Sequence, residues 1–189
     1  LNFAGNNIDD FLGTAKVYNA ALWHDSTRLS FDSLIVRSMI ADDKKMLTVQ
    51  TNELEGNLTG DFKILELPDA FKVFLNRYYP AYIEAPKQGI SNQDFSFYIQ
   101  TRQVDNYVKL LDKRLSGFNN SVFSGNLKLA ANEMNVNASV PDFTYDGKRF
   151  TNLDLVSKGT LDSLIATISV SDISLSDSLH IPNTKLVLG

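Results

Sequence analysis

The chain of 189 residues has no cysteine, two histidines and a single tryptophan. Without cysteine it can form neither a disulfide nor a thiolate metal site. Its 22 acidic residues outnumber its 18 basic ones, the net charge is −4, and no window is rich in Lys or Arg. Binding to nucleic acid and electrostatic docking to anionic membranes both need a basic face, so both are disfavoured. No apolar run approaches the roughly 18 residues that a membrane-spanning helix needs.

Residues for catalysis are also scarce. His24 and His180 have no partner at the spacing of metal ligands, and we interpret both as turn or surface histidines. Asp9-Asp10 and Asp42-Asp43 are adjacent carboxylates, but neighbouring side chains on a strand point to opposite faces, which disfavours a shared acid–base role. Nucleophile-elbow, zinc-protease, Walker and dinucleotide-binding motifs are all missing. We therefore predict a protein that is not an enzyme and that uses no cofactor or metal.

The sequence is instead dominated by alternation. Met134, Val136, Ala138 and Val140 alternate with polar residues, which is the pattern of a strand with one dry and one wet face. Hydrophobic content is 43% and charged content 21%, close to the globular average. The same period predicts strands over residues 13–22, 28–40, 46–51, 54–64, 95–99, 124–130, 134–140, 150–156, 164–170 and 173–175.

Turn residues separate several of these strands. Asp42-Asp43-Lys44-Lys45 is predicted to form a polar turn, and Asp146-Gly147 is predicted to form a hairpin turn. Gly56 and Gly60 share the parity of the apolar positions in their strand. Glycine on a dry face indicates a bulge or a close approach of another backbone.

Two segments change to a helical period. In residues 67–79 the apolar positions fall on one stripe, with Pro68 in the first turn and Pro80 after the end. A second stripe over residues 104–115 is followed by Gly117, which we expect to cap the helix. Both helices are predicted to be short and amphipathic and to cover part of the dry face. The alternative is that they plug or edge an apolar groove, or rest on a membrane.

A strand followed by a helix therefore occurs twice. This divides the chain into residues 1–80, a linker over residues 81–94, and residues 95–189, with the two repeats expected to form one continuous sheet. The chain opens at Leu1 without Met and closes within the apolar run Leu186-Val187-Leu188. Both ends are expected to be cut from a longer sheet, so the chain is interpreted as a fragment.

Several runs resemble a known family. They are Leu1-Asn2-Phe3-Ala4-Gly5-Asn6-Asn7-Ile8-Asp9-Asp10-Phe11-Leu12-Gly13-Thr14, Leu47-Thr48-Val49-Gln50-Thr51-Asn52-Glu53-Leu54-Glu55-Gly56-Asn57-Leu58-Thr59-Gly60-Asp61-Phe62, the helix ending in Tyr79-Pro80, the run over residues 118–129, and Val140-Pro141-Asp142-Phe143-Thr144-Tyr145-Asp146-Gly147. This succession of strands and short helices is similar to the recurrent unit of TamB proteins of the Bacteroidetes type, which are AsmA-like. The resemblance covers most of the chain and rests on the order of strands, not on a catalytic motif.

The resemblance implies a mostly β fold, a long antiparallel sheet curled into an open half-barrel or β-taco. It also implies the periplasmic portion of an inner-membrane-anchored protein that bridges to the outer membrane. Its partners would be phospholipid acyl chains in an apolar groove and an outer-membrane assembly barrel of the BamA or TamA type. Strand parity alone selects the expected groove lining: Phe31, Leu47, Val49, Leu58, Phe62, Phe97, Ile99, Leu127, Leu129, Val136, Ile168 and Val170.

Two other functions fit the same strands. One is a closed β-sandwich that acts as a binding or adhesion module, in which a second sheet fills the interior. The other is a hydrolase on a β scaffold, which is disfavoured because its acid–base candidates do not cluster. A groove leaves apolar area open, whereas a sandwich covers it with its own side chains.

Overall fold

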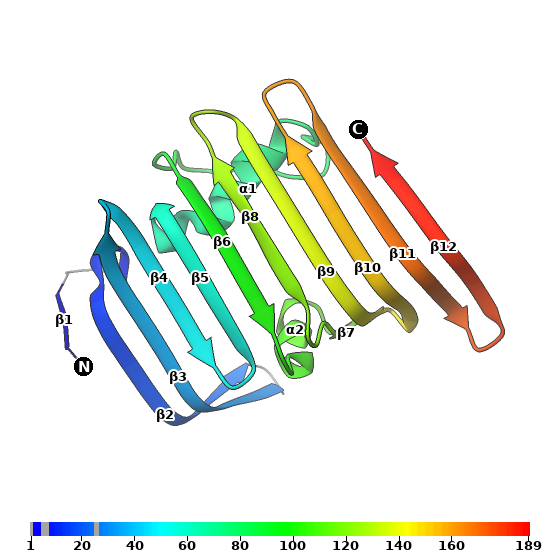
Figure 1. Cartoon of the computed structure of the whole chain (residues 1–189), viewed down its shortest axis with the longest axis horizontal. Helices are drawn as coiled ribbons and strands as arrows, with labels where there is room; N and C mark the ends of the chain where they lie inside the picture. The colour runs from blue at the N-terminus through cyan, green and yellow to red at the C-terminus, as the bar shows by residue number, and fades with distance from the viewer. Residues whose placement is uncertain (1, 5–7, 25–26) are drawn as a thin grey trace.

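A computed structural model describes residues 2–4, 8–24 and 27–189 of the chain (Figure 1). It is mostly β and consists of one open antiparallel sheet with short helices. Neighbouring strands follow one another almost in sequence order, from β1 at one edge to β12 at the other. The predicted fold class, a long antiparallel sheet that is not closed, is confirmed.

The strands lie close to the predicted ranges. Their bounds are β1 Asn2–Ala4, β2 Leu12–His24, β3 Thr27–Ala41, β4 Lys44–Thr51, β5 Leu54–Asp61, β6 Asp94–Thr101, β7 Leu115–Gly117, β8 Val122–Lys128, β9 Glu133–Tyr145, β10 Lys148–Gly159, β11 Leu164–Ser176 and β12 Leu179–Leu188. Several predictions were wrong. The strand expected over 54–64 ends at Asp61, the strand expected over 124–130 ends at Lys128, and the strands expected over 164–170 and 173–175 are one strand, β11. Lys44 and Lys45, expected in a turn, begin β4, and β7 and β12 lie outside the predicted ranges.

The alternation over β9 is confirmed. Met134 and Val140 are buried, while Asn137 and Ser139 are exposed. The predicted turns are confirmed at Asp42-Asp43 and at Asp146-Gly147, because both residues of each pair have positive φ. This left-handed pair is the backbone of the tight hairpin turn that suits twisted antiparallel strands.

Helix α1 (Leu67–Asn76) follows a 3-10 turn, Ile64–Glu66, and connects β5 to β6. It begins where predicted, with Pro68 in its first turn, and ends three residues earlier than expected. In Figure 1 it crosses behind the strands at one end of the sheet. Its residues Ala70 and Phe74 form the core with apolar side chains of the sheet and its loops: Phe62, Phe95, Leu127, Met134 and Leu164.

Glycines permit this close packing. Gly159 in β10 lies directly beneath Phe74, and a Cβ at Gly159 would come within 2.5 Å of the Phe74 ring. At Gly60, whose φ is +140°, a Cβ would lie 2.1 Å from the carbonyl oxygen of Asp94 in the neighbouring strand. The predicted close approach of a backbone is therefore confirmed for Gly60, whereas Gly56 has only ordinary contacts.

Helix α2 (Asp105–Leu111) connects β6 to β8 and so lies at the opposite end of the strands from α1 (Figure 1). It is shorter than the predicted 104–115, because Asp112 is extended and Leu115–Gly117 forms strand β7 against β9. Gly117 does not cap the helix. It lies where a Cβ would be 2.7 Å from the Asp142 carbonyl oxygen, so glycine is needed for β7 to approach β9.

Six long strands change the phase of their alternation along one line, which we call the bend line. Its residues are Asn19 in β2, Asp32 in β3, Pro141 in β9, Asn152 in β10, Ser171 in β11 and Asn183 in β12. The register pairs on either side continue, but the pairs at these positions are missing from the ladder. Asn19, Asn152 and Asn183 all have φ near +50°, a conformation that Asn adopts more readily than most residues.

The change of phase keeps apolar side chains on one face. Val140 lies on the core face of β9, and three residues later Phe143 stacks on Phe150 at 4.6 Å and contacts Phe118. Without the bend, residues 140 and 143 would point to opposite faces. The expected linker over residues 81–94 leads from α1 into β6, and the pairing of β5 with β6 carries the sheet across it.

Candidate functional site

One row of residues crosses the sheet between its two helices and is apolar along its whole length. We call it the apolar row; its members pair in register from β2 to β12: Ala15, Val36, Val49, Gly56, Ile99, Phe123, Ala138, Leu155, Ile168 and Leu186. Ile99 is 38% exposed and Leu186 is 48% exposed. The row is therefore covered incompletely by the rest of the chain.

The predicted groove residues lie on or next to this row. Val49, Ile99 and Ile168 belong to it, and the register puts Leu47, Leu58, Phe97 and Val136 in the adjacent row on the same face. Val170 lies on the other side of the row, in β11. Phe62 and Leu127 are buried in the core with α1, so this part of the predicted lining is occupied. Five more predicted residues are partly buried and pack against that core: Leu47, Leu58, Phe97, Leu129 and Val136. The side chain of Phe31 lies outside the described residues.

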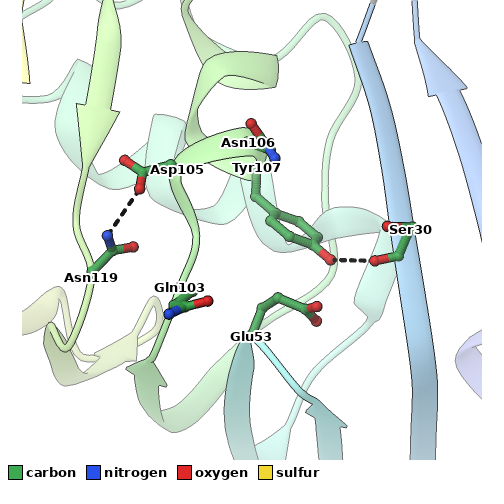
Figure 2. A pocket seen from close by; sticks show the side chains of 7 residues that line it. All are labelled: Ser30, Glu53, Gln103, Asp105, Asn106, Tyr107 and Asn119. Carbon is green, nitrogen blue, oxygen red and sulfur yellow. Dashed lines mark hydrogen bonds between the residues drawn. The ribbon is translucent and has the colours of Figure 1, made fainter.

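A polar cavity lies at the other helix. It has a volume of about 440 Å³ and is formed by α2, the loops around it, the β4–β5 turn and β3 (Figure 2), and its lining residues are Ser30, Glu53, Gln103, Asp105, Asn106, Tyr107 and Asn119. We call it the α2 cavity. A second cavity beside it shares three of these residues, Glu53, Gln103 and Asn119.

Asp105 and Asn119 form the fixed wall of the α2 cavity. Asp105 accepts hydrogen bonds from the backbone N–H of Gly117, at 2.6 Å, and from the Asn119 amide, at 2.9 Å. These two bonds, that from Asn119 first, hold the pKa of Asp105 below its ordinary value. The Asn119 oxygen accepts the N–H of Val104 at 2.7 Å. These groups are fully used in positioning the start of α2.

Glu53 and Tyr107 form the opposite wall. The backbone of Glu53 is held on both sides, since its N–H donates to the Thr51 hydroxyl and its carbonyl oxygen accepts the Arg102 N–H. Among the described residues, no donor reaches the Glu53 Oε2 atom, which is shielded from solvent. Burial, then the nearby Glu53 charge, and then a hydrogen bond from the phenol to the Glu53 carboxylate raise the pKa of Tyr107 to about 12, so the phenol stays protonated. The Tyr107 hydroxyl also lies 3.5 Å from the Ser30 carbonyl oxygen. In Figure 2 the tips of both side chains point toward the same space beside Ser30.

His180 is the second histidine that the sequence singled out, and it lies on the surface of β12 as expected. Its Nδ1 is 3.0 Å from Asp172 Oδ2 and 3.1 Å from the Ser174 hydroxyl. A catalytic triad needs the serine and the carboxylate on different ring nitrogens, whereas here both are at Nδ1 and Ser174 donates to Asp172. The three residues form a surface hydrogen-bond cluster. His24 has its side chain outside the described residues.

Two further searches of the described residues found nothing. No group of three or more His, Asp or Glu side chains there is arranged to hold a metal ion. No helix in that part of the chain is long and apolar enough to cross a membrane.

Comparisons of the chain with protein-family models, with curated proteins and with solved structures find no match. The α2 cavity was not predicted from the sequence. Its residues Ser30, Glu53 and Asn119 come from widely separated strands and loops, and none belongs to a spaced motif. A possible signal is the density of carboxamide and carboxylate residues at 103–106 and 119–120, immediately beside apolar strands.

Proposed function

We propose that the apolar row and its neighbours bind the acyl chains of lipids, and that the chain is a non-catalytic segment of a TamB-like protein. The observation that supports this proposal is the row itself, ten apolar or glycine positions in register across an open sheet. An apolar strip that its own chain leaves partly exposed favours an apolar occupant. The resemblance adds the proposed location, the periplasm, and the proposed partner, an outer-membrane assembly barrel of the BamA or TamA type.

Acyl-chain binding here needs no charged side chain. Each buried methylene contributes about 0.8 kcal/mol, so a chain lying along part of the row would gain useful affinity from contact area alone. The row runs across the strands, and the two α-helices stand at opposite ends of those strands. In the middle of the row Ala138 is buried and Phe118 stacks on Phe123. A flexible acyl chain would therefore contact the row where it is exposed, as at Ile99 and Leu186.

The test uses two adjacent positions of β6 that are equally accessible. Ile99, on the row, is 38% exposed, and Tyr98, on the opposite face, is 37% exposed. A photo-reactive benzoylphenylalanine is placed at either position, and the chain is irradiated with vesicles of phosphatidylethanolamine and phosphatidylglycerol. We expect a phospholipid adduct by mass spectrometry from position 99 and not from position 98.

The yield should also be insensitive to salt, because no charge pair drives the binding. Equal labelling at positions 98 and 99 would refute a lipid site on this face. Labelling of protein instead of lipid from position 99, in a cell envelope extract, would refute acyl-chain binding and favour a protein partner that covers the row.

A further inference from the structure

The α2 cavity has the size and the polar lining of a small-molecule site, and the apolar row does not involve it. We propose that it binds a neutral saccharide of one or two sugar rings, held by Glu53, Gln103 and Asn106. Its volume of about 440 Å³ lies within the range of cavities that hold small ligands, about 300–1,000 Å³. The lining contains two carboxylates, three carboxamides, a serine and a tyrosine.

The groups of the cavity divide into those already used and those available. Asp105 and Asn119 are committed to each other and to the backbone of Val104 and Gly117. The Glu53 carboxylate accepts a hydrogen bond from Tyr107, but its Oε2 atom is shielded and has no donor among the described residues. An oxygen in this state is unfavourable until a donor is supplied. The Gln103 and Asn106 carboxamides are exposed and make no hydrogen bond to the described part of the chain. The groups available to a ligand are therefore one acceptor, Glu53 Oε2, and two carboxamides, Gln103 and Asn106, that both donate and accept.

This set selects for hydroxyl groups. A sugar hydroxyl donates to the carboxylate while its neighbour accepts from a carboxamide N–H. An ammonium group has donors only, so it would pair with Glu53 and the carboxamide oxygens and make no use of the carboxamide N–H groups. Tyr107 adds an aromatic surface, and aromatic rings pack well against apolar ring faces, such as the C–H face of a pyranose.

Charge excludes the anionic ligands. Glu53 and Asp105 are the charged side chains of the cavity wall, and no Lys or Arg is among its described lining residues. Arg102 lies in the neighbouring cavity, where it pairs with Glu55 at 3.5 Å and reaches the carbonyl oxygens of Thr51 and Asn52. A phosphate or carboxylate in the α2 cavity would therefore face two carboxylates and no free cation.

The experiment is an NMR titration of the ¹⁵N-labelled full chain with maltose and with N,N′-diacetylchitobiose, and, as charged probes, glucose 6-phosphate and 1,4-diaminobutane. We expect at least one disaccharide to shift the side-chain amide signals of Gln103 and Asn106, and neither charged probe to do so. Glu53→Gln should weaken the binding about tenfold or more, as for the loss of one hydrogen bond to a charged group. Gln103→Ala should weaken it by about three- to tenfold, as for the loss of a hydrogen bond between neutral groups.

The matched control is Asn57→Ala, because Asn57 is an exposed carboxamide on β5, away from the cavity. Its affinity should equal that of the unmodified chain. The amide spectra of the variants report their folding, and Gln103→Ala tests the site independently if Glu53→Gln fails to fold. The proposal is overturned if neither disaccharide shifts these signals, if the phosphate or the diamine binds more tightly than the sugars, or if Asn57→Ala weakens binding as much as the cavity variants.

Discussion

The contact between Phe74 and Gly159 allows α1 to be tested as a structural cover of the sheet. Phe74 is 3% exposed and lies over Gly159, with its ring 5.3 Å from that of Tyr78. Removing the ring in Phe74→Ala takes away a buried aromatic side chain and leaves a cavity, which costs about 3–5 kcal/mol of unfolding free energy. That is a large share of the roughly 5–15 kcal/mol available to a typical domain.

The reverse change, Gly159→Ala, adds one methyl group to the same space. Its carbon would meet the Phe74 ring at 2.5 and 2.8 Å, well inside the optimal carbon–carbon separation of about 3.5–4.0 Å. Overpacking of this kind costs about 1–3 kcal/mol. When Phe74 is already alanine the ring is gone, so the added methyl group meets no ring and fills part of the cavity.

The double variant should therefore be no less stable than Phe74→Ala alone. The loss of unfolding free energy in the double variant should be smaller than the sum of the losses in the two single variants by at least about 1 kcal/mol. A coupling of this size is typical of residues in contact. Urea unfolding of the four proteins, followed by far-UV circular dichroism, measures each free energy. Tyr82→Ala, at a side chain that is 89% exposed, is the control and should change stability by less than about 0.5 kcal/mol. Strict additivity would refute the packing of α1 on β10.

Two more predictions concern a glycine and a histidine. Gly60→Ala should destabilise the chain by more than about 3 kcal/mol, because both its φ of +140° and the Asp94 carbonyl oxygen exclude a Cβ. Gly56→Ala is the control and should be nearly neutral, since the nearest contact of its Cβ would be 3.8 Å away. Equal melting temperatures for the two variants would contradict the backbone contact at Gly60. The hydrogen bond to Asp172 raises the pKa of His180 above its ordinary 6.5, so the stability from this pair is present below pH 6.5 and is lost as pH rises through the raised value. An NMR titration should show this pKa above 6.5, and lower in Asp172→Asn, whereas a value of 6.5 or below in the unmodified chain would disprove the pairing.

The alternation of β9 and the turn at Asp42-Asp43 could be predicted because both are local properties of the sequence. The extent of α2 could not, since the apolar stripe continues to Leu115 in sequence while β7 pairs with β9 in space. Similarly, the sequence predicts one strand that ends at Val170 and another that begins at Ile173, because the apolar residues change parity between these positions. In the structure β11 continues through the bend line between them. Both errors arise because a neighbouring strand overrides the local pattern.

For the candidate sites, parity placed Val49, Ile99 and Ile168 on one face, and the register then joined them into a single row. Parity could not show that Leu127 is covered, because α1 arrives from a distant part of the chain. The α2 cavity could not be predicted either, since it depends on the β4–β5 turn bringing Glu53 beside Tyr107. Contacts between residues far apart in the sequence determine whether Leu127 is covered and whether the α2 cavity forms, and the local pattern does not contain them.

The bend line also has a mechanical consequence. At Pro141, Asn152, Ser171 and Asn183 the ladder lacks one pair between each two neighbouring strands. We therefore expect the sheet to bend more readily along this line across β9 to β12 than on either side of it, as two plates that meet at a crease. A force that tilts one plate would bend the sheet at this crease. The plate that carries the aromatic stack of Phe143 and Phe150 could then change its angle while the plate beneath α1 keeps its packing.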